Sequence, residues 1–455
     1  MHRTCQQLSE DAQRIWSAGV AAVQPQRLIP QFVHIHGDTL HIGDEKFALP
    51  SLEQIVVVGA GKAGASMVAA LENALGDELL RAKNVRGWVN VPADCLRTTR
   101  AVHLHAARPA GVNEPTAAGV AGTEKILQLV GDLGPADLCL CVISGGGSAL
   151  LPAPIEGVSL ADKVAITREL TARGATIQQL NAVRRELSTV KGGGLARACR
   201  AGHLVTLILS DVLGDDLESI ASGPTVPRPP TPERAIQVLE DSRLADHPTG
   251  KKLIELLQKK MRQHSRPTDD KPSHVTNLLI GNNATAVDAA GMEAEHLGYN
   301  HAMISATEPE GPAEEVAQHL VQMAQSMRRD QKTNCLISGG EPTVHLAPTD
   351  QRGLGGRNQQ LALAALCALE DWRHLALLAG GTDGEDGPTD AAGALANEQV
   401  AQAARNQSLD TAAYLRRNDA YHFFQQAGGL LKTGPTQTNV CDLRVLVVGE
   451  GGKDE

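Results

Sequence analysis

The chain contains six short apolar runs, and each ends in a turn rich in Gly, Ser, Asn or Asp. They are 55–64, 138–148, 204–216, 277–285, 335–341 and 375–386. Near-continuous runs of Val, Ile and Leu are typical of strands buried on both faces of a parallel sheet. Ligands of such sheets bind just beyond the carboxyl ends of the strands. The pattern therefore predicts six strands, and each following turn is a candidate part of a binding site.

Helix-like segments alternate with these runs through the first half of the chain, as in βαβ units. An opening helix is expected over 8–23. Two later helix starts carry capping boxes, in Ser159 with Asp162 and in Thr176 with Gln179. This alternation predicts an α/β fold.

The helix expected after Thr176 keeps apolar residues at helical spacing as far as three glycines at 192–194. Arg184 and Lys191 lie along another stripe of it, with Lys191 at the C-terminal end. A cation there either complements the helix dipole or contacts a phosphate, and the residues leave both interpretations open.

The length of 455 residues exceeds one ordinary core, because single cores stop growing near about 250 to 300 residues. The most proline-rich passage, 223–235, is interpreted as a loop between domains. We place the boundary near residue 240, with an N-terminal domain over 1–240 and a C-terminal domain over 241–455.

Composition limits the partners. A net charge of -10 argues against nucleic acid or an anionic membrane, and with 2% aromatic residues base-stacking surfaces are scarce. No run approaches the roughly 18 apolar residues of a membrane span. The eight cysteines contain no C-x-x-C pair and are expected to be reduced. We expect a cytoplasmic protein that acts on a small molecule; a homodimer is left open.

The first chemical motif, GAGKAG at 59–64, fits the dinucleotide fingerprint G-x-G-x-x-G through Gly59, Gly61 and Gly64. A dinucleotide site also needs an acid at the end of the next strand, where this chain has Asn90. Lys62 would lie at the positive end of a helix, which disfavours a cation unless an anion binds there. A phosphate site is therefore favoured over a nicotinamide dinucleotide.

The turn after the second run is a second candidate anion site, although it has no lysine. Its glycines let the backbone approach an anion. Its candidate residues are Ser144, Gly145, Gly146, Gly147 and Ser148. Asp211 follows the third run, where a carboxylate can bind Mg²⁺ or accept a hydroxyl proton. An ordinary turn residue explains Asp211 equally well.

The second half offers further polar groups at strand ends and helix starts. Asn282 follows the fourth run, Glu341 follows the fifth, and Gly356, Arg357 and Asn358 open a helix-like segment. An arginine at a helix start again suggests an anion, and its planar fork suits phosphate or carboxylate. These five residues are candidate substrate or phosphate ligands.

The turn after the sixth run, at 380–393, concentrates acids among glycines. It contains Asp383, Glu385, Asp386 and Asp390 and does not fit an EF-hand loop. Acids at this density repel one another unless a cation is near. We expect Asp383, Asp386 and Asp390, together with Asp211, to supply metal ligands.

The ordered set of motifs resembles the glycerate 2-kinase family whose C-terminal half is called the MOFRL domain. The motifs are GAGKAG, VISGGGSALL, LNAVRRELSTVKGGGLA, LILSDVLGDDLESIASGPT, IGNN, ISGGEPTV, GLGGRNQQLAL, GGTDGEDGPTDAAG and TGPTQTNV. The resemblance implies two dissimilar three-layer α/β domains, the first Rossmann-like, with the active site in the cleft between them. It also implies phosphorylation of D-glycerate at the 2-hydroxyl with ATP and Mg²⁺.

Residue by residue, the family's motif lysine matches Lys62 and its motif arginine matches Arg357. Together with Asp211 they are the expected catalytic residues. Two alternatives remain: a hydroxypyruvate reductase using NAD(P)H, which the G-x-G-x-x-G match favours, and a sugar-phosphate-binding regulatory module.

Overall fold

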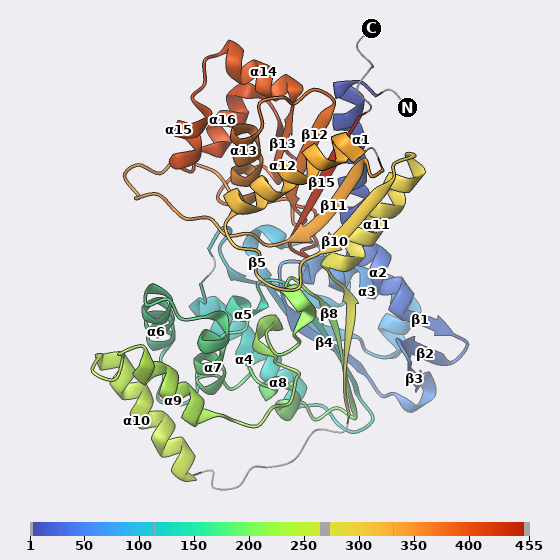
Figure 1. The fold of residues 1–455 in the computed structure, drawn as a ribbon. Coiled ribbons are helices and arrows are strands. Elements are labelled where there is room, and N and C mark those ends of the chain that lie inside the picture. Colours follow the sequence, from blue (N-terminus) through green and yellow to red (C-terminus); the bar gives the residue numbers. More distant parts are fainter. Residues whose placement is uncertain (1–2, 113, 264–273, 331, 450–455) are drawn as a thin grey trace. The chain divides into compact units, whose positions relative to one another are not determined.

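The computed structural model describes residues 3–112, 114–263, 274–330 and 332–449 (Figure 1). Its contacts divide the chain into two compact units. Unit 1 comprises Met1–Arg27 with Gly281–Glu455, and unit 2 comprises Leu28–Ile280.

This division differs from the sequence boundary near 240. Helices α9 (Pro232–Asp241) and α10 (Pro248–Gln263) share an apolar cluster with α7 (Ile177–Glu186) and so belong to unit 2. The proline-rich passage 223–235 therefore lies inside unit 2 rather than between the units. The opening helix, α1 (Cys5–Ala22), joins unit 1, because its apolar face packs on the sheet formed by the end of the chain.

Unit 2 is built on a six-stranded sheet with the order β6-β5-β4-β7-β8-β9. The bounds are β4 (Ile55–Ala60), β5 (Arg86–Pro92), β6 (Val102–Arg108), β7 (Leu138–Ile143), β8 (His203–Leu209) and β9 (Val275–Gly281). The neighbours from β6 to β8 pair in parallel. The strand order reverses between β4 and β7, and in open α/β sheets ligands bind at such a switch point.

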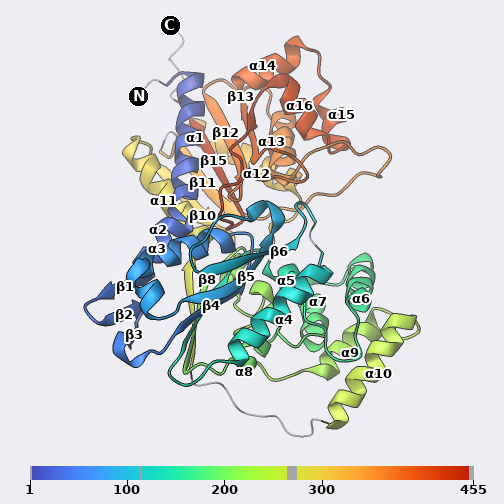
Figure 2. The same cartoon turned by 180° about the vertical axis from the view of Figure 1, so that it is seen from behind.

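Helices cover both faces of this sheet (Figures 1 and 2). Val56, Val58 and Cys141 pack on one face against Ile126 and Leu195. Helix α3 (Gly64–Ala82) contacts β4, β5 and β7. The remaining helices are α2 (Pro25–Phe32), α4 (Ala117–Gly131), α5 (Gly147–Leu150), α6 (Leu160–Ala172) and α8 (Gly194–Ala198). A small antiparallel sheet contains β1 (Val33–His36), β2 (Thr39–Ile42) and β3 (Glu45–Ala48), and short 3-10 turns are η1 (Leu49–Ser51), η2 (Ala93–Cys95), η3 (Leu213–Asp215) and η4 (Ile220–Ser222).

Unit 1 has its own six-stranded sheet, with the order β10-β11-β15-β12-β13-β14. The bounds are β10 (His301–Ser305), β11 (Cys335–Gly340), β12 (Leu375–Gly381), β13 (Gly393–Asn397), β14 (Leu430–Leu431) and β15 (Asp442–Val448). The last strand, β15, runs antiparallel between β11 and β12, so this sheet is mixed rather than parallel. The start of β15 therefore lies beside the carboxyl ends of β11 and β12.

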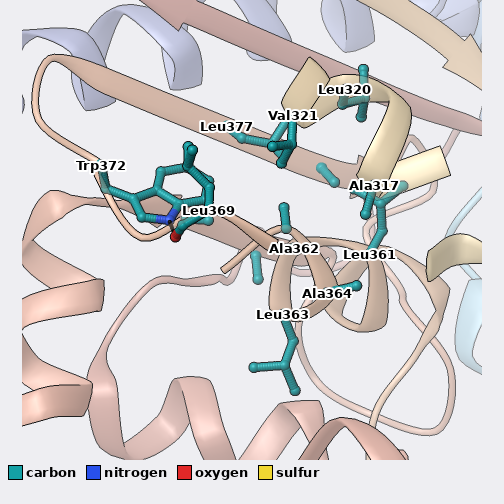
Figure 3. Close-up of a cluster of buried hydrophobic side chains, with 14 of the residues drawn as sticks. Ala317, Leu320, Val321, Leu361, Ala362, Leu363, Ala364, Leu369, Trp372 and Leu377 are labelled. Carbon is teal, nitrogen blue, oxygen red and sulfur yellow. Dashed lines mark hydrogen bonds between the residues drawn. The ribbon is translucent and has the colours of Figure 1, made fainter. Parts of the chain in front are cut away.

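The two faces of this sheet are also covered by helices. Trp16 and Val287, from α1 and α11, pack on one face with Ile337. Leu320 and Phe423, from α12 and α16, belong to the cluster on the other face, part of which is drawn in Figure 3. The bounds are α11 (Asn283–His296), α12 (Ala313–Asp330), α13 (Arg357–Ala368), α14 (Glu398–Asn406), α15 (Thr411–Arg416) and α16 (Ala420–Ala427).

These findings confirm the α/β class with two dissimilar three-layer units. All six apolar runs form strands, and both capping boxes are present at α6 and α7. Within the described ranges, no helix combines the length and the apolar character needed to cross a membrane.

Candidate functional site

The turn after β4 is fastened to the turn after β7. The amide of Lys62 donates to the carbonyl of Gly145 at 2.8 Å, and the amide of Ala63 donates to Ser144 Oγ at 3.0 Å. Gly61 has φ +149°, and a Cβ atom there would overlap Ser144, so only glycine permits this close approach. Gly59 likewise lies against the backbone of β7 with φ +150°.

These hydrogen bonds between the two turns change the interpretation of the G-x-G-x-x-G sequence at 59–64. The amides of Gly61, Lys62, Ala63 and Gly64 all donate to acceptors within the protein. A pyrophosphate cradle needs such amides to point at the ligand. The glycines are therefore explained by strand packing, and the side chain of Lys62 remains the candidate anion contact in this turn.

A second cation lies close to that lysine. A Cβ atom built on Gly146 would be 3.5 Å from Lys62 Cγ and 3.6 Å from Arg108 Nη2. Arg108, at the end of β6, is 4% exposed, and its Nη1 donates to the carbonyl of Val112. Sequence reasoning did not select Arg108. The sequence feature that could have identified it is one that other candidates share: a charged residue at the end of a strand.

Lys191 does not lie in a helix, because α7 ends at Glu186 and not at the glycine run. The helix-dipole explanation of this lysine is therefore wrong. Its side chain is 4% exposed, and Nζ donates to Ser148 Oγ at 2.6 Å and to the Ser148 carbonyl at 2.9 Å. Burial lowers the pKa of Lys191 well below its usual range, and the nearby cations Lys163 and Arg184 lower it further. Lys191 thus anchors the turn after β7.

Asn90 has a structural role at the end of β5. Its side chain is fully buried, and Nδ2 donates to the carbonyl of Leu150 at 2.8 Å. In dinucleotide-binding folds this strand end carries an acid that binds the ribose. Asn90 instead hydrogen-bonds to the backbone, so it does not bind a ribose as that acid would.

In unit 1, Asp386 occupies the start of α13. It is 2% exposed, and its carboxylate accepts the amides of Asn358 at 3.0 Å and Gln359 at 2.8 Å. Gly356 is the N-cap, and a Cβ atom there would overlap Asp386. Burial raises the pKa of Asp386 to about 7, against the opposing effect of the two amides. A carboxyl group of the protein itself therefore accepts the free amides at this helix start.

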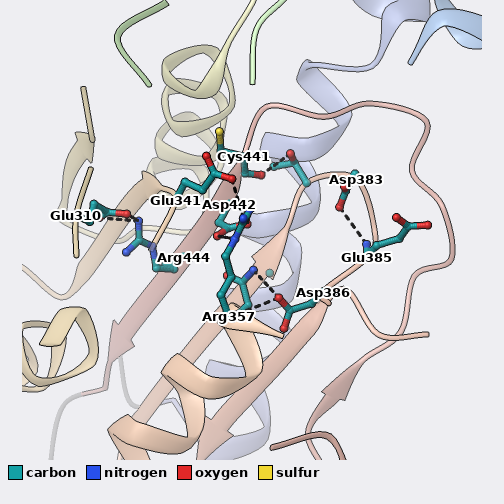
Figure 4. A network of polar contacts seen from close by, with 12 residues as sticks. Glu310, Glu341, Arg357, Asp383, Glu385, Asp386, Cys441, Asp442 and Arg444 are labelled. Carbon is teal, nitrogen blue, oxygen red and sulfur yellow. Dashed lines mark hydrogen bonds and ion pairs between the residues drawn. The ribbon is translucent and has the colours of Figure 1, made fainter. Parts of the chain in front are cut away.

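Arg357, the first residue of α13, meets two carboxylates (Figure 4). Its Nε lies 2.6 Å from Asp442 Oδ2, Nη2 lies 3.0 Å from Asp442 Oδ1, and Nη1 lies 2.7 Å from Glu341 Oε1. Burial lowers the pKa of Arg357, but the charges of Asp442 and Glu341 outweigh it and raise the pKa overall. These internal acids explain why a cation is stable at this helix start without a bound ligand.

Asp442 was missed by sequence reasoning. It is the first residue of β15, has no exposed surface, and binds Arg357 in a bidentate geometry. Asn283 donates through Nδ2 to the carbonyls of Val440 and Asp442, which fixes the start of this strand. Asn282, the predicted ligand, instead caps α11, because its Oδ1 accepts the amide of Thr285 at 3.0 Å.

Several of the predicted metal ligands have partners within their own unit. Asp390 pairs with Lys432 at 2.9 Å and accepts from the Tyr421 hydroxyl at 2.7 Å, while Asp383 accepts the amide of Glu385. Asp211 follows β8 by two residues, in unit 2. Across the described ranges, no group of three or more His, Cys, Asp or Glu side chains is placed to hold a metal ion.

The chain matches two protein families and several characterised proteins. Residues 11–258 match a family described as a domain of unknown function, DUF4147, and residues 334–442 match the MOFRL family. A glycerate kinase of Danio rerio is 35% identical over 502 residues, covering 97% of this chain and 98% of that protein. A D-glycerate 2-kinase of Thermotoga maritima is 36% identical, covering 88% of this chain and 91% of that protein.

A solved structure agrees with these matches. The crystal structure of a glycerate kinase from Thermotoga maritima superposes with a TM-score of 0.80 at 34% identity, covering 97% of this chain and 100% of that chain. A protein of Agrobacterium vitis, 37% identical over 87% of this chain, is named provisionally as a hydroxypyruvate reductase.

Proposed function

Because the chain belongs to the glycerate kinase family, we propose that it transfers the γ-phosphoryl group of ATP to the 2-hydroxyl of D-glycerate, giving 2-phospho-D-glycerate and ADP. The observation that carries this proposal is the nearly full-length similarity to a glycerate kinase, which spans both units. In phosphoryl transfer the protein mainly positions groups and neutralises charge.

In unit 2, Lys62 is the proposed contact to the transferred phosphoryl group. It lies at the switch point between β4 and β7, and its neighbour Arg108 adds a second positive charge near Gly146. Preorganised cations stabilise the negative charge that develops on the phosphoryl oxygens. Gly59 and Gly61 support this function indirectly, because they let the two turns approach.

In unit 1, Arg357 is the proposed second catalytic cation, and Asp442 and Glu341 are the residues that orient it. The bidentate contact with buried Asp442 uses Nε and Nη2, which fixes the plane of the guanidinium. Two of the five guanidinium N–H groups, one on Nη1 and one on Nη2, are not used by these acids and can donate to a carboxylate or a phosphoryl group. Asp386 orders the same helix start from the other side.

Magnesium is expected with the nucleotide, and the four predicted acidic ligands are not equally well placed to bind it. The oxygens of Asp386 accept backbone amides and those of Asp390 bind Lys432 and Tyr421, so neither is placed as a metal ligand. Mg²⁺ in nucleotide enzymes is commonly held by one or two carboxylates and the phosphates themselves. Asp211, beyond β8, remains the proposed protein ligand. The bound metal would neutralise phosphate charge.

The competing function is reduction of hydroxypyruvate with NAD(P)H, which the fingerprint after β4 favours. Two observations oppose it: the amides of this turn are already bonded within the protein, and Asn90 occupies the position of the ribose-binding acid. A single preparation distinguishes the two functions. With D-glycerate, ATP and Mg²⁺ we expect ADP to form; with hydroxypyruvate and NADH we expect no loss of nicotinamide absorbance. The reverse pattern would replace the kinase by the reductase.

A further inference from the structure

Three basic residues of unit 2 are near enough to lower one another's pKa, and none of them forms an ion pair with a carboxylate among the described residues. They are Lys163 of α6, Arg184 of α7 and Lys191, which follows α7. Lys163 is 6% exposed, and its Nζ has no hydrogen-bond partner among the described residues. Burial and, to a smaller extent, the charge of Arg184 together lower the pKa of Lys163 to about 8. Arg184 is half-buried, so the cluster has an edge open to solvent.

Other basic residues close to these three in the fold are paired, one on α7 and one on α10. Arg185, next to Arg184, lies 3.3 Å from Glu218, and Lys252 lies 2.6 Å from Asp162, the residue before Lys163. Within the described parts of the chain, no carboxylate forms an ion pair with Lys163, Arg184 or Lys191. The fold therefore neutralises the charges beside this cluster and leaves the cluster itself positive.

A buried charge without a counter-ion is destabilising, and a bound anion would relieve that destabilisation. The cluster also adjoins a turn at the carboxyl edge of the sheet, because Lys191 Nζ donates to Ser148 after β7. Ser222 extends this contact, with its Oγ 3.2 Å from Ser148 Oγ. The position is therefore suited to an anion that enters at the switch point of the sheet.

We propose that Lys163, Arg184 and Lys191 form a subsite for the polyphosphate of the nucleotide, so that unit 2 holds the phosphates of ATP and ADP. Three cations match a polyphosphate better than a carboxylate, which carries a single negative charge. The Nζ atom of Lys191 already holds Ser148, so Lys163 and Arg184 are the direct ligands. The identity of the nucleotide rests on the proposed function; the affinity for polyphosphate does not.

The test measures binding to the intact protein by calorimetry and by thermal shift. The probes are inorganic tripolyphosphate, ADP and D-glycerate, each without metal at low salt, because screening weakens such contacts. The variants are Lys163→Met and Arg184→Met, which keep a long apolar side chain. The control is Lys251→Met, which removes an exposed charge from α10 of the same unit.

We expect tripolyphosphate and ADP to bind the wild type and to raise its Tm. Lys163→Met and Arg184→Met should each weaken both ligands at least about tenfold, which is about 1.4 kcal/mol. Neither variant should have a lower Tm than the wild type without ligand, because each removes an uncompensated charge, and Lys251→Met should bind as the wild type does.

Wild-type affinity for tripolyphosphate in both variants would overturn the proposal. So would a loss confined to D-glycerate, which would assign the cluster to a carboxylate. If the variants lose polyphosphate binding as expected but the wild type does not phosphorylate D-glycerate, only the proposed function fails.

Discussion

Asp386 provides a stability test of the buried polar network at the start of α13. The perturbation is Asp386→Asn, which keeps the size of the side chain and removes its titration. In the folded protein burial raises the pKa of Asp386 to about 7 from an ordinary value of 3.8. Between about pH 4 and about pH 7 the folded state therefore holds a proton that the unfolded chain has released, and stability falls as the pH rises through this window.

The magnitude follows from linkage. A pKa raised by about 3 units corresponds to about 4 kcal/mol in total, at 1.36 kcal/mol per unit. Between about pH 5 and about pH 8 the wild type should lose about 2–3 kcal/mol relative to Asp386→Asn, because part of the loss occurs at lower pH. Urea unfolding followed by tryptophan fluorescence measures this difference, since Trp16 and Trp372 are both buried in unit 1.

Asp390→Asn is the matched control, because Asp390 is an exposed acid of the same loop. The hydrogen bond from Lys432 lowers the pKa of Asp390, so it stays ionised across the window and its difference curve should be flat. A flat curve for Asp386→Asn as well would show that Asp386 is ionised throughout and would refute its assignment as a group that titrates near neutral pH.

Further substitutions test other parts of the structure. Lys62→Ala should lower kcat by about 10²-fold or more with an unchanged circular dichroism spectrum, because it removes a cation from the reacting group; near-normal turnover would exclude that role. Asp442→Asn should destabilise unit 1 by about 2–4 kcal/mol in urea unfolding, because it removes the buried partner of Arg357, and it should also lower kcat. A variant as stable and active as the wild type would contradict this. Gly61→Ala should destabilise unit 2 more than Thr176→Ala, since the former overlaps Ser144 while the latter removes one helix cap worth about 1 kcal/mol; the opposite order in thermal unfolding would disprove the close packing of the two turns.

Local patterns in the sequence predicted local structure well. The capping boxes at Ser159 and Thr176 depend on residues three positions apart, and both form as expected. The helix after Thr176 shows where such patterns mislead. Its apolar spacing continues through Leu187 and Val190, but the chain leaves the helix after Glu186. Leu187 still packs in the cluster of α7, whereas Val190 is buried in the core beside the sheet of unit 2.

Distant contacts account for what the sequence did not predict. Arg357 and Asp442 are 85 positions apart, and no periodicity of one segment records that they meet. The same holds for Lys163, whose polar position on α6 resembles any solvent-facing lysine until α7 packs against it. The reasoning that a cation at a helix start needs an anion was correct for Arg357, although the anions are the protein's own carboxylates.

The division into units also depends on packing between segments that are far apart in the sequence. The proline-rich passage 223–235 has the composition of a linker, yet α9 continues the apolar cluster of α7 and keeps the passage within unit 2. Likewise the sequence of α1 indicates an amphipathic helix, but it does not indicate that the sheet of unit 1 covers its apolar face.

The position of phosphorylation on D-glycerate is the most direct test of the proposed function. The purified protein is supplied with ATP, Mg²⁺ and D-glycerate and coupled to enolase with no phosphoglycerate mutase present. Enolase accepts 2-phosphoglycerate only, so we predict immediate formation of phosphoenolpyruvate, which Lys62→Ala should slow by about 10²-fold or more. ADP formation with no enolase signal until mutase is added would mean that the product is 3-phosphoglycerate, and no ADP formation at all would contradict the kinase assignment.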